Sequence, residues 1–255
     1  MIDWAELTLL IYVIARMSGF VLFNPLFGRS SIPGIFRAGV VFVLAVSVLS
    51  STQQSVAVPA GILQLAFRIL LEMSVGLLLG AVVNFFFYIP QLAGEVIDTQ
   101  LGMTMNQVYD PGSQANLSMN GVLLNALMML LFFAANGHHT LLRIFLTSGE
   151  IVPYGAAVLG NAAANAMLEL FVQCTLFAVK LCLPILAAEL VGQIGMGILM
   201  KVIPQINVFA INIELKVIIG MALTFLLISP ISEYLLTIEM NMLNSLEEIL
   251  LLTAG

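Results

Sequence analysis

Six stretches of almost uninterrupted apolar residues dominate this sequence. A helix that crosses a lipid bilayer needs about 20 mostly apolar residues, and each stretch with its flanks approaches that length. Polar breaks at 100–120, 148–165 and 200–216 separate the later stretches and are predicted to be loops. The pattern predicts an all-α, polytopic membrane protein with about six hydrophobic helices, at residues 7–23, 40–49, 73–90, 121–135, 170–190 and 217–230.

The sequence holds too few charges for a water-soluble protein. Only 9% of its residues are charged, whereas a typical soluble domain carries roughly 25%. No polar interval is long enough for a separate soluble domain, so residues 1–255 are predicted to form a single membrane domain. The 14 acidic and 8 basic residues include no run of Lys or Arg, and we expect no binding to nucleic acid.

No motif in the sequence points to catalysis, to a metal or to a cofactor. His138 and His139 are adjacent, and adjacent helical residues point about 100° apart, so they do not form the i, i+4 pair of a zinc site. Asp98, Glu95 and His138 would have to meet in three dimensions to form a catalytic group, and nothing in their spacing requires that. We therefore predict a protein without a cofactor that is not an enzyme.

Several ionisable residues lie inside the apolar stretches. A charge at the centre of a bilayer costs several kcal/mol, so these side chains should face protein or water. Arg68 and Glu72 are four residues apart and are predicted neighbours on one helical face. Two interpretations stay open, structural pairs or a conducting path. The predicted buried charges are Arg16, Arg68, Glu72, Lys180 and Glu189.

Glycines in the apolar stretches predict close helix contacts. Gly76 and Gly80 form a GxxxG pattern, in which small residues let two helix backbones approach each other. A second glycine-rich face at 192–197 lies between Pro184 and Pro204, where we expect a broken or bent helix.

The last segment, 235–252, has the pattern of an amphipathic helix. Apolar residues recur with helical periodicity on one face, and polar residues occupy the other. We expect its apolar face to lie against membrane or a partner. The apolar positions are Leu235, Met242, Leu243, Leu246, Ile249 and Leu250, and the polar ones are Glu239, Asn244, Glu247 and Glu248.

The segment 103–120 differs from the rest of the chain in its composition. It is rich in Met, Asn, Gln and Ser, and Asp110 is its one charge. Its Asp-Pro-Gly sequence favours a turn, and the flexible Met side chains suit a deformable seal. On composition alone an ordinary loop is an equal alternative. The candidate site residues here are Met103, Met105, Asn106, Tyr109, Asp110, Pro111, Gly112 and Met119.

Four motifs in order resemble those of the FliR family, called SctT in virulence injectisomes. The first is Arg16 followed by FNPLFG at 23–28, with Pro and Arg residues after it. The second is GEVIDTQLGM at 94–103, followed by Asp110 and Pro111. The third is NGH at 136–138, and the fourth is PQINVF at 204–209. Each motif alone is weak, and together they cover most of the chain.

This resemblance implies a subunit of a helical export gate in the bacterial inner membrane, at the flagellar basal body. It implies FliP-like and FliQ-like membrane subunits, an FlhB-like protein, unfolded export substrates in transit and membrane lipid as partners. Several predicted spans would then pack as bent hairpins inside an oligomer. Segment 103–120 matches the pore-proximal block of the family, and the predicted subunit contact comprises Pro204, Gln205, Asn207 and Phe209.

The alternative function is a secondary transporter. Arg68, Glu72, Lys180 and Glu189 would then bind a solute or a coupling ion near the membrane midplane. The motifs show no internal repeat, which speaks against this alternative.

Overall fold

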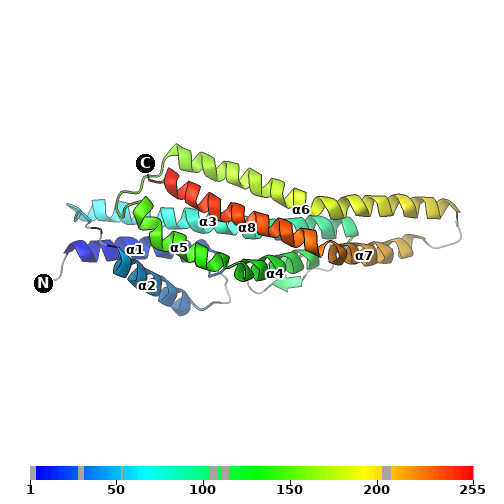
Figure 1. The fold of residues 1–255 in the computed structure, drawn as a ribbon, viewed down its shortest axis with the longest axis horizontal. Coiled ribbons are helices and arrows are strands. Elements are labelled where there is room, and N and C mark those ends of the chain that lie inside the picture. Colours follow the sequence, from blue (N-terminus) through cyan, green and yellow to red (C-terminus); the bar gives the residue numbers. More distant parts are fainter. Residues whose placement is uncertain are drawn as a thin grey trace. The chain divides into compact units, whose positions relative to one another are not determined.

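The computed structural model describes residues 4–27, 32–52, 54, 56–103, 108–110, 115–202 and 208–254. These residues form eight helices and one pair of short strands (Figure 1). The predicted all-helical fold class is confirmed. The helices are α1 Trp4–Phe23, α2 Gly34–Ser51, α3 Ile62–Leu101, α4 Met119–Ala134, α5 Gly137–Ile151, α6 Asn161–Val202, α7 Val208–Leu226 and α8 Ile228–Leu252.

The helices have the length and composition of a polytopic membrane protein. Within the described part of the chain, α1, α2, α3 and α6 are each long and apolar enough to cross a bilayer. Two pairs, α4 with α5 and α7 with α8, meet the same criteria when each pair is counted as one broken span. The total of four to six candidate spans agrees with the predicted number of about six.

Two helices extend far beyond the apolar stretches that predicted them. The stretch 73–90 is the middle of α3, which has 40 residues, and 170–190 is the middle of α6, which has 42. At 1.5 Å per residue each helix is about 60 Å long, twice the thickness of the hydrocarbon core. Polar residues at the two ends lower the hydropathy, but they do not end a helix.

Prolines do not end the two long helices, so the break expected near 192–197 is not observed, and a bend there stays a prediction. Pro90, which closed a predicted span, lies inside α3. Helix α6 passes Pro184 and the glycines at 192–197 and continues to Val202. Pro204, the second limit of that expected break, lies outside the described residues.

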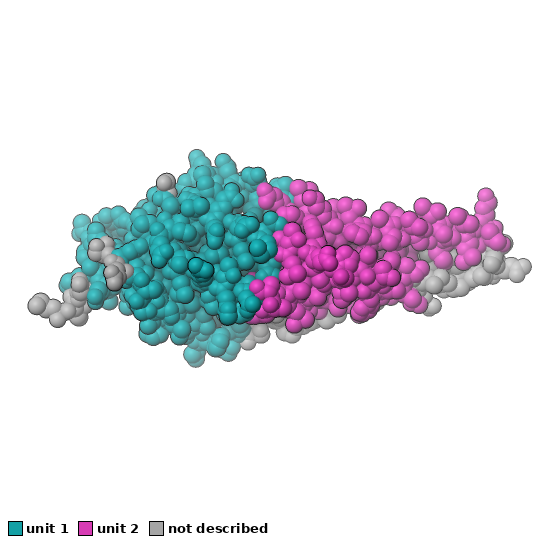
Figure 2. Space-filling model, in the orientation of Figure 1, with its two compact units in different colours: residues 1–86, 136–172, 239–255 teal, residues 87–135, 173–238 magenta. Residues whose placement is uncertain are grey.

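The chain forms two compact units (Figure 2). Unit 1 comprises residues 1–86, 136–172 and 239–255, and unit 2 comprises 87–135 and 173–238. Helices α3, α6 and α8 contribute residues to both units. The single membrane domain over 1–255 stays a prediction.

In unit 1, α1 crosses α3 at glycines on both helices. A Cβ atom added to Gly76 would overlap the main-chain oxygen of Arg16, and one added to Gly19 would overlap that of Met73. Gly80 continues the same contact and faces Phe23. The packing role predicted from the GxxxG pattern is therefore confirmed, and it brings the two helix backbones into direct contact.

Helix α8 turns the apolar side of the 235–252 segment toward the protein interior. Leu235, Met242 and Leu246 are fully buried, whereas Asn244 and Glu247 are exposed. One polar residue of the predicted outer face departs from this pattern. Glu239 is buried between the apolar positions.

We predict that Gly76→Ala lowers the thermal stability of the purified protein in detergent. The added methyl group meets main-chain atoms that cannot move aside, and overpacking of this kind costs about 1–3 kcal/mol. Gly192→Ala is the matched control, because a Cβ atom there meets no atom within 4 Å and alanine favours helix more than glycine does. Thermal unfolding followed by circular dichroism measures both variants. Equal midpoints for the two would contradict the predicted contact.

Candidate functional site

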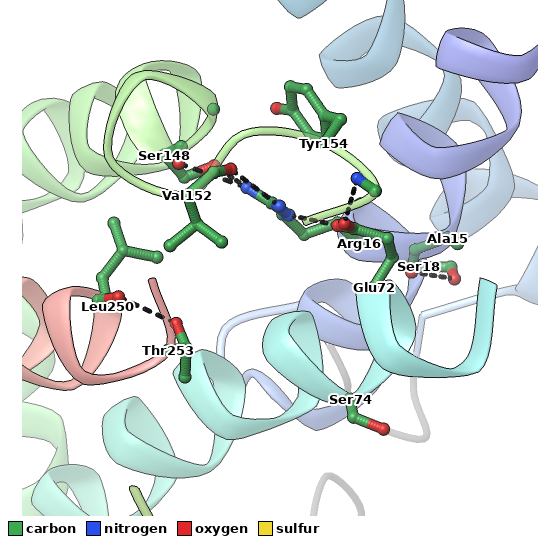
Figure 3. A network of polar contacts seen from close by, with 12 residues as sticks. Ala15, Arg16, Ser18, Glu72, Ser74, Ser148, Val152, Tyr154, Leu250 and Thr253 are labelled. Atoms are coloured by element: carbon green, nitrogen blue, oxygen red, sulfur yellow. Dashed lines mark hydrogen bonds and ion pairs between the residues drawn. The ribbon is translucent and has the colours of Figure 1, made fainter. Parts of the chain in front are cut away.

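Arg16 is the centre of a buried polar network in unit 1 (Figure 3). Its Nε atom donates to Oε2 of Glu72 at 2.7 Å. Its two Nη atoms donate to the main-chain oxygens of Ser148, at 3.2 Å, and Val152, at 3.0 Å. These two carbonyl groups belong to the C-terminal end of α5, where a positive charge is favourable. Arg16 therefore links α1, α3 and the end of α5.

The other side of this network is the start of the connection between α5 and α6. The second carboxylate oxygen of Glu72 accepts the main-chain N–H of Gly155 at 2.7 Å. Gly155 has φ +83 and lies against the Tyr12 ring, so the position favours glycine. Both oxygens of Glu72 thus have strong donors, as a buried carboxylate requires.

The ring of Tyr154 covers the Arg16 guanidinium, with 4.2 Å between Cζ and the ring centroid. At this distance the ring adds a cation–π attraction. Burial raises the pKa of the Tyr154 phenol, and the nearby positive charge of Arg16 offsets only part of that rise. The phenol is therefore neutral at physiological pH.

A second polar site lies in unit 2, where Asp98 joins the end of α3 to the start of α4. Oδ2 of Asp98 accepts the main-chain N–H of Asn120 at 3.1 Å, and Oδ1 accepts the side-chain amide of the same residue. The main-chain oxygen of Asp98 accepts the N–H of Met103 at 2.8 Å. Asp98 and Asn120 are both buried. We call Asp98, Met103 and Asn120 the Asp98 clamp.

The local sequence explains the first arm of the clamp. Gly102 has φ +74, and its N–H bonds to the Thr99 oxygen at 3.2 Å. Together with the bond from Met103 to Asp98, this is the Schellman motif that ends many helices at a glycine. Met103, the next residue, is buried, and a hydrophobic contact at this position frequently accompanies the motif.

The second arm of the clamp uses the N-terminus of α4. Ser118 precedes the helix, and its hydroxyl accepts the N–H of Gly121 at 3.0 Å. The Asp98 carboxylate accepts the N–H of Asn120 in the same turn. Two of the free N–H groups at this helix end are thereby satisfied. The partial positive charge of the helix end stabilises the carboxylate.

Close backbone contact between α3 and α4 makes this reach possible. A Cβ atom added to Gly94 would overlap the main chain of Gly121, and one on Gly121 would lie 3.2 Å from the Gln91 oxygen. Since no side chain separates the helices there, the short side chain of Asp98 spans the distance to Asn120.

Residues 7–242 match the sequence profile of the family described as bacterial export proteins, family 1. The chain belongs to this family. The relatives that it matches include the flagellar biosynthetic protein FliR of Bacillus subtilis (strain 168), with 28% identity over 90% of this chain and 89% of that protein. FliR of Escherichia coli (strain K12) is 25% identical, over 93% and 92% of the two chains. The Yop proteins translocation protein T of Yersinia pestis is 26% identical over 78% and 77%.

These matches confirm the resemblance to the FliR family that the motifs indicated. The matched region contains both polar sites. Membership of the FliR family implies a component of an export apparatus. Its members include proteins named for the flagellum and a protein named for translocation of Yop proteins.

Segment 103–120 of this FliR-family chain is only partly a loop. It contains β1, Val108–Asp110, and β2, Ala115–Leu117, which pair antiparallel with Tyr109 opposite Asn116. Tyr109 and Asp110 therefore lie in β1. Of the predicted site residues, Met103 is buried and Met119 is exposed, whereas Met105, Asn106, Pro111 and Gly112 lie outside the described residues.

The predicted subunit contact near residue 204 falls mostly outside the described part of the chain. Phe209 belongs to the first turn of α7. Pro204, Gln205 and Asn207 lie outside the described residues.

The predicted pair of Arg68 and Glu72 does not form. Glu72 binds Arg16, and among the described residues Arg68 forms no ion pair. Spacing of four residues permits a pair on an exposed face, but Glu72 is buried against α1, and there Arg16 is its partner. Arg68 is only partly buried.

The two predicted charges in unit 2 also differ in their surroundings. Glu189 is buried and lies 3.8 Å from the Nζ atom of Lys216, and Gln193 donates to it at 3.3 Å. Lys180 is exposed on the surface of this chain. Among the described residues, Glu72 and Glu189 are therefore each paired with a basic residue of their own unit.

Sequence reasoning missed Asp98, Asn120 and Ser148 as members of these networks. Asp98 was weighed only as a catalytic group. A signal that could have indicated this role is its position near the end of an apolar stretch, four residues after Gly94 and four before Gly102. Its partner is 22 residues away along the chain, and no spacing rule identifies that.

We predict that Glu72→Gln destabilises the protein strongly. The change leaves the buried Arg16 guanidinium without a counter-charge, and breaking a buried pair in this way costs about 3–5 kcal/mol. Arg68→Gln is the control, since Arg68 is partly exposed and not ion-paired to Glu72. The thermal midpoint and the yield of folded protein in detergent measure the difference. An equal loss of thermal stability in the two variants would show that the ion pair of Arg16 and Glu72 contributes no more to stability than Arg68 does.

Proposed function

We propose that this protein is a structural subunit of the flagellar type III export gate. It forms part of the channel through which unfolded substrates cross the bacterial inner membrane at the flagellar basal body. The observation that carries this proposal is the match to FliR proteins along almost the whole of both chains. The protein is a conduit component and not an enzyme.

The exposed apolar surface of the chain supports a place inside an assembly. Only 17% of the span window of α2 and 33% of that of α6 is buried within this chain. Such large uncovered apolar faces mark contacts with protein or lipid. We propose FliP-like and FliQ-like membrane subunits, an FlhB-like protein and membrane lipid as the partners that cover them.

A purification tests this assignment. The tagged protein is isolated in mild detergent from its own organism, and we expect FliP-like and FliQ-like proteins to copurify with it. Deletion of its gene should abolish export of flagellar substrates. A protein that is isolated alone and transports a small solute in vesicles would contradict the proposal and support the transporter alternative.

Within this gate, we propose that segment 103–120 helps to seal the channel when no substrate is in transit. Both described ends of the segment are bonded to one residue, because Asp98 accepts hydrogen bonds from Met103 and Asn120. Its Met and amide side chains suit a deformable seal.

We predict that replacing residues 104–117 by a short Gly-Ser linker makes the idle gate leak. The replacement keeps both ends of the segment and removes the side chains that would fill the channel. Release of a trapped dye from vesicles that contain the assembled complex measures the leak. The control replaces Val158 and Leu159, exposed residues of the α5–α6 connection, by Ser. An unchanged permeability with an assembled complex would refute the seal.

We predict that Ala at Pro204, Gln205, Asn207 and Phe209 together weakens assembly. If these residues form a subunit contact, less FliP-like protein should copurify with the variant than with the unaltered protein. Lys201→Ala is the control, because this exposed residue precedes the proposed contact. The ratio of the two proteins after purification is the measurement. Normal recovery of the partner would exclude the contact.

A further inference from the structure

Lys180 lies in the middle of an exposed apolar face of α6. We propose that this face is an interface with a helix of a neighbouring subunit, and that an Asp or Glu of that helix forms an ion pair with Lys180. The inference rests on the proposed function, since it requires an assembly of several subunits. It adds the chemistry by which one of those subunits is recognised.

The apolar residues around Lys180 form one continuous stripe within unit 2. At 3.6 residues per turn they fall on the same side of the helix as Lys180, and together they cover about 33 Å of its length. Lys180 is the one charge on this stripe. The stripe comprises Leu176, Leu183, Val191, Ile194 and Ile198, each of which is more than half exposed.

The described chain offers Lys180 no counter-charge. Lys180 is exposed, and among the described residues it forms no ion pair. Glu189, nine residues later, is buried and already lies 3.8 Å from the Nζ atom of Lys216. Glu169 is eleven residues earlier, which is about 16 Å along the helix and too far for a pair. Any counter-charge for Lys180 therefore comes from outside the described chain.

The length of α6 requires a protein neighbour at this position. Its exposed apolar side chains run from Leu168 to Val202, over about 51 Å, whereas the hydrocarbon core of a bilayer is about 30 Å thick. If the core includes Lys180, the charge needs a partner or water there. If the core lies to one side of Lys180, the apolar side chains on the other side need a protein cover that begins at Lys180. Both placements favour a neighbouring protein beside this residue.

The charge of Lys180 selects the kind of helix that fits. A purely apolar helix on the stripe would bury the ammonium group without a partner, which is costly. A carboxylate opposite Lys180 neutralises it, and only one alignment of the two helices brings the charges together. Leu176 and Leu183, one turn to either side, would then exclude water from the pair.

Replacement of Lys180 tests the interface. The tagged full chain is isolated in mild detergent from its own organism, and the FliP-like and FliQ-like subunits recovered per tagged chain are measured. We expect Lys180→Gln to lower the recovery of one of them at least about tenfold, since the carboxylate of the partner loses its counter-charge. Lys201→Gln is the matched control, because it makes the same change at an exposed residue in the last turn of α6. Lys180→Arg keeps the charge and should keep the subunit.

The stability of the chain purified alone separates an interface from a role in the fold. Lys180 has no ion pair among the described residues, so Lys180→Gln should unfold at the same temperature as the unaltered chain. A lowered thermal midpoint together with a lost subunit would place Lys180 in the fold and overturn the interface.

A charge exchange identifies the acidic partner. Lys180→Glu sets two carboxylates against each other, and two such groups in contact cannot both ionise without repulsion. We expect this variant to lose the subunit. Each acidic residue in the membrane helices of the FliP-like and FliQ-like subunits is then replaced by Lys, one at a time. Recovery at one position identifies the pair, and no recovery at any position would overturn it.

The recovered material also distinguishes this inference from the proposed function. If the unaltered chain is isolated without either subunit, the proposed function fails, and the interface fails with it. If Lys180→Gln recovers both subunits normally, the interface is overturned and the proposed function stands. A variant that keeps both subunits and loses only copurified phosphatidylglycerol would show a lipid headgroup at Lys180, which also overturns the proposal.

Discussion

A charged side chain that is buried needs hydrogen-bond partners inside the protein. Arg16 of α1 is such a residue, and its partners lie on several elements of unit 1. Its guanidinium bonds to Glu72 of α3 and to two carbonyl groups at the end of α5. Glu72 in turn holds Gly155, in the connection to α6. Three helices and one connection therefore depend on a single ion pair that has no access to solvent.

Glu72 in unit 1 and Asp98 in unit 2 each lie four residues from a glycine at which α3 touches another helix. In unit 1, Gly76 lets α3 touch α1, and Glu72 lies four residues earlier on the same helix. In unit 2, Gly94 lets α3 touch α4, and Asp98 lies four residues later. Residues four apart share a helix face. A glycine thus brings the second helix within reach of the acidic side chain, and each carboxylate accepts a hydrogen bond from that helix.

The centres of the long helices could be predicted from the sequence, but their ends could not. Apolar residues identified the middle of α3 and α6, since burial and lipid contact both select them. The ends of these helices carry polar residues, and Pro90 and Pro184 lie inside them. Hydropathy reflects the free energy of transferring side chains out of water, whereas a helix ends where its backbone hydrogen bonds end. The end of an apolar stretch and the end of a helix therefore need not coincide.

The candidate site shows the same division. Composition distinguished segment 103–120, because its amide and Met residues lie between two apolar stretches. The pairing of the two strands at Tyr109 and Asn116 could not be predicted, because three-residue strands are too short to show an alternation of apolar and polar residues. Asp98, which joins its ends, could not be assigned because its hydrogen-bond partner was unknown until α3 and α4 were placed against each other.

By itself the sequence determined that this is a helical membrane protein of the FliR family, with few charges and several of them inside apolar stretches. Only the tertiary structure decided which groups neutralise those charges. Arg68 is four residues from Glu72, yet Arg16, 56 residues away, is the partner. The spacing along the sequence shows only which ion pairs are possible within one helix. The crossing of α1 and α3 determines that Glu72 is buried, and a buried carboxylate needs a donor that is buried beside it.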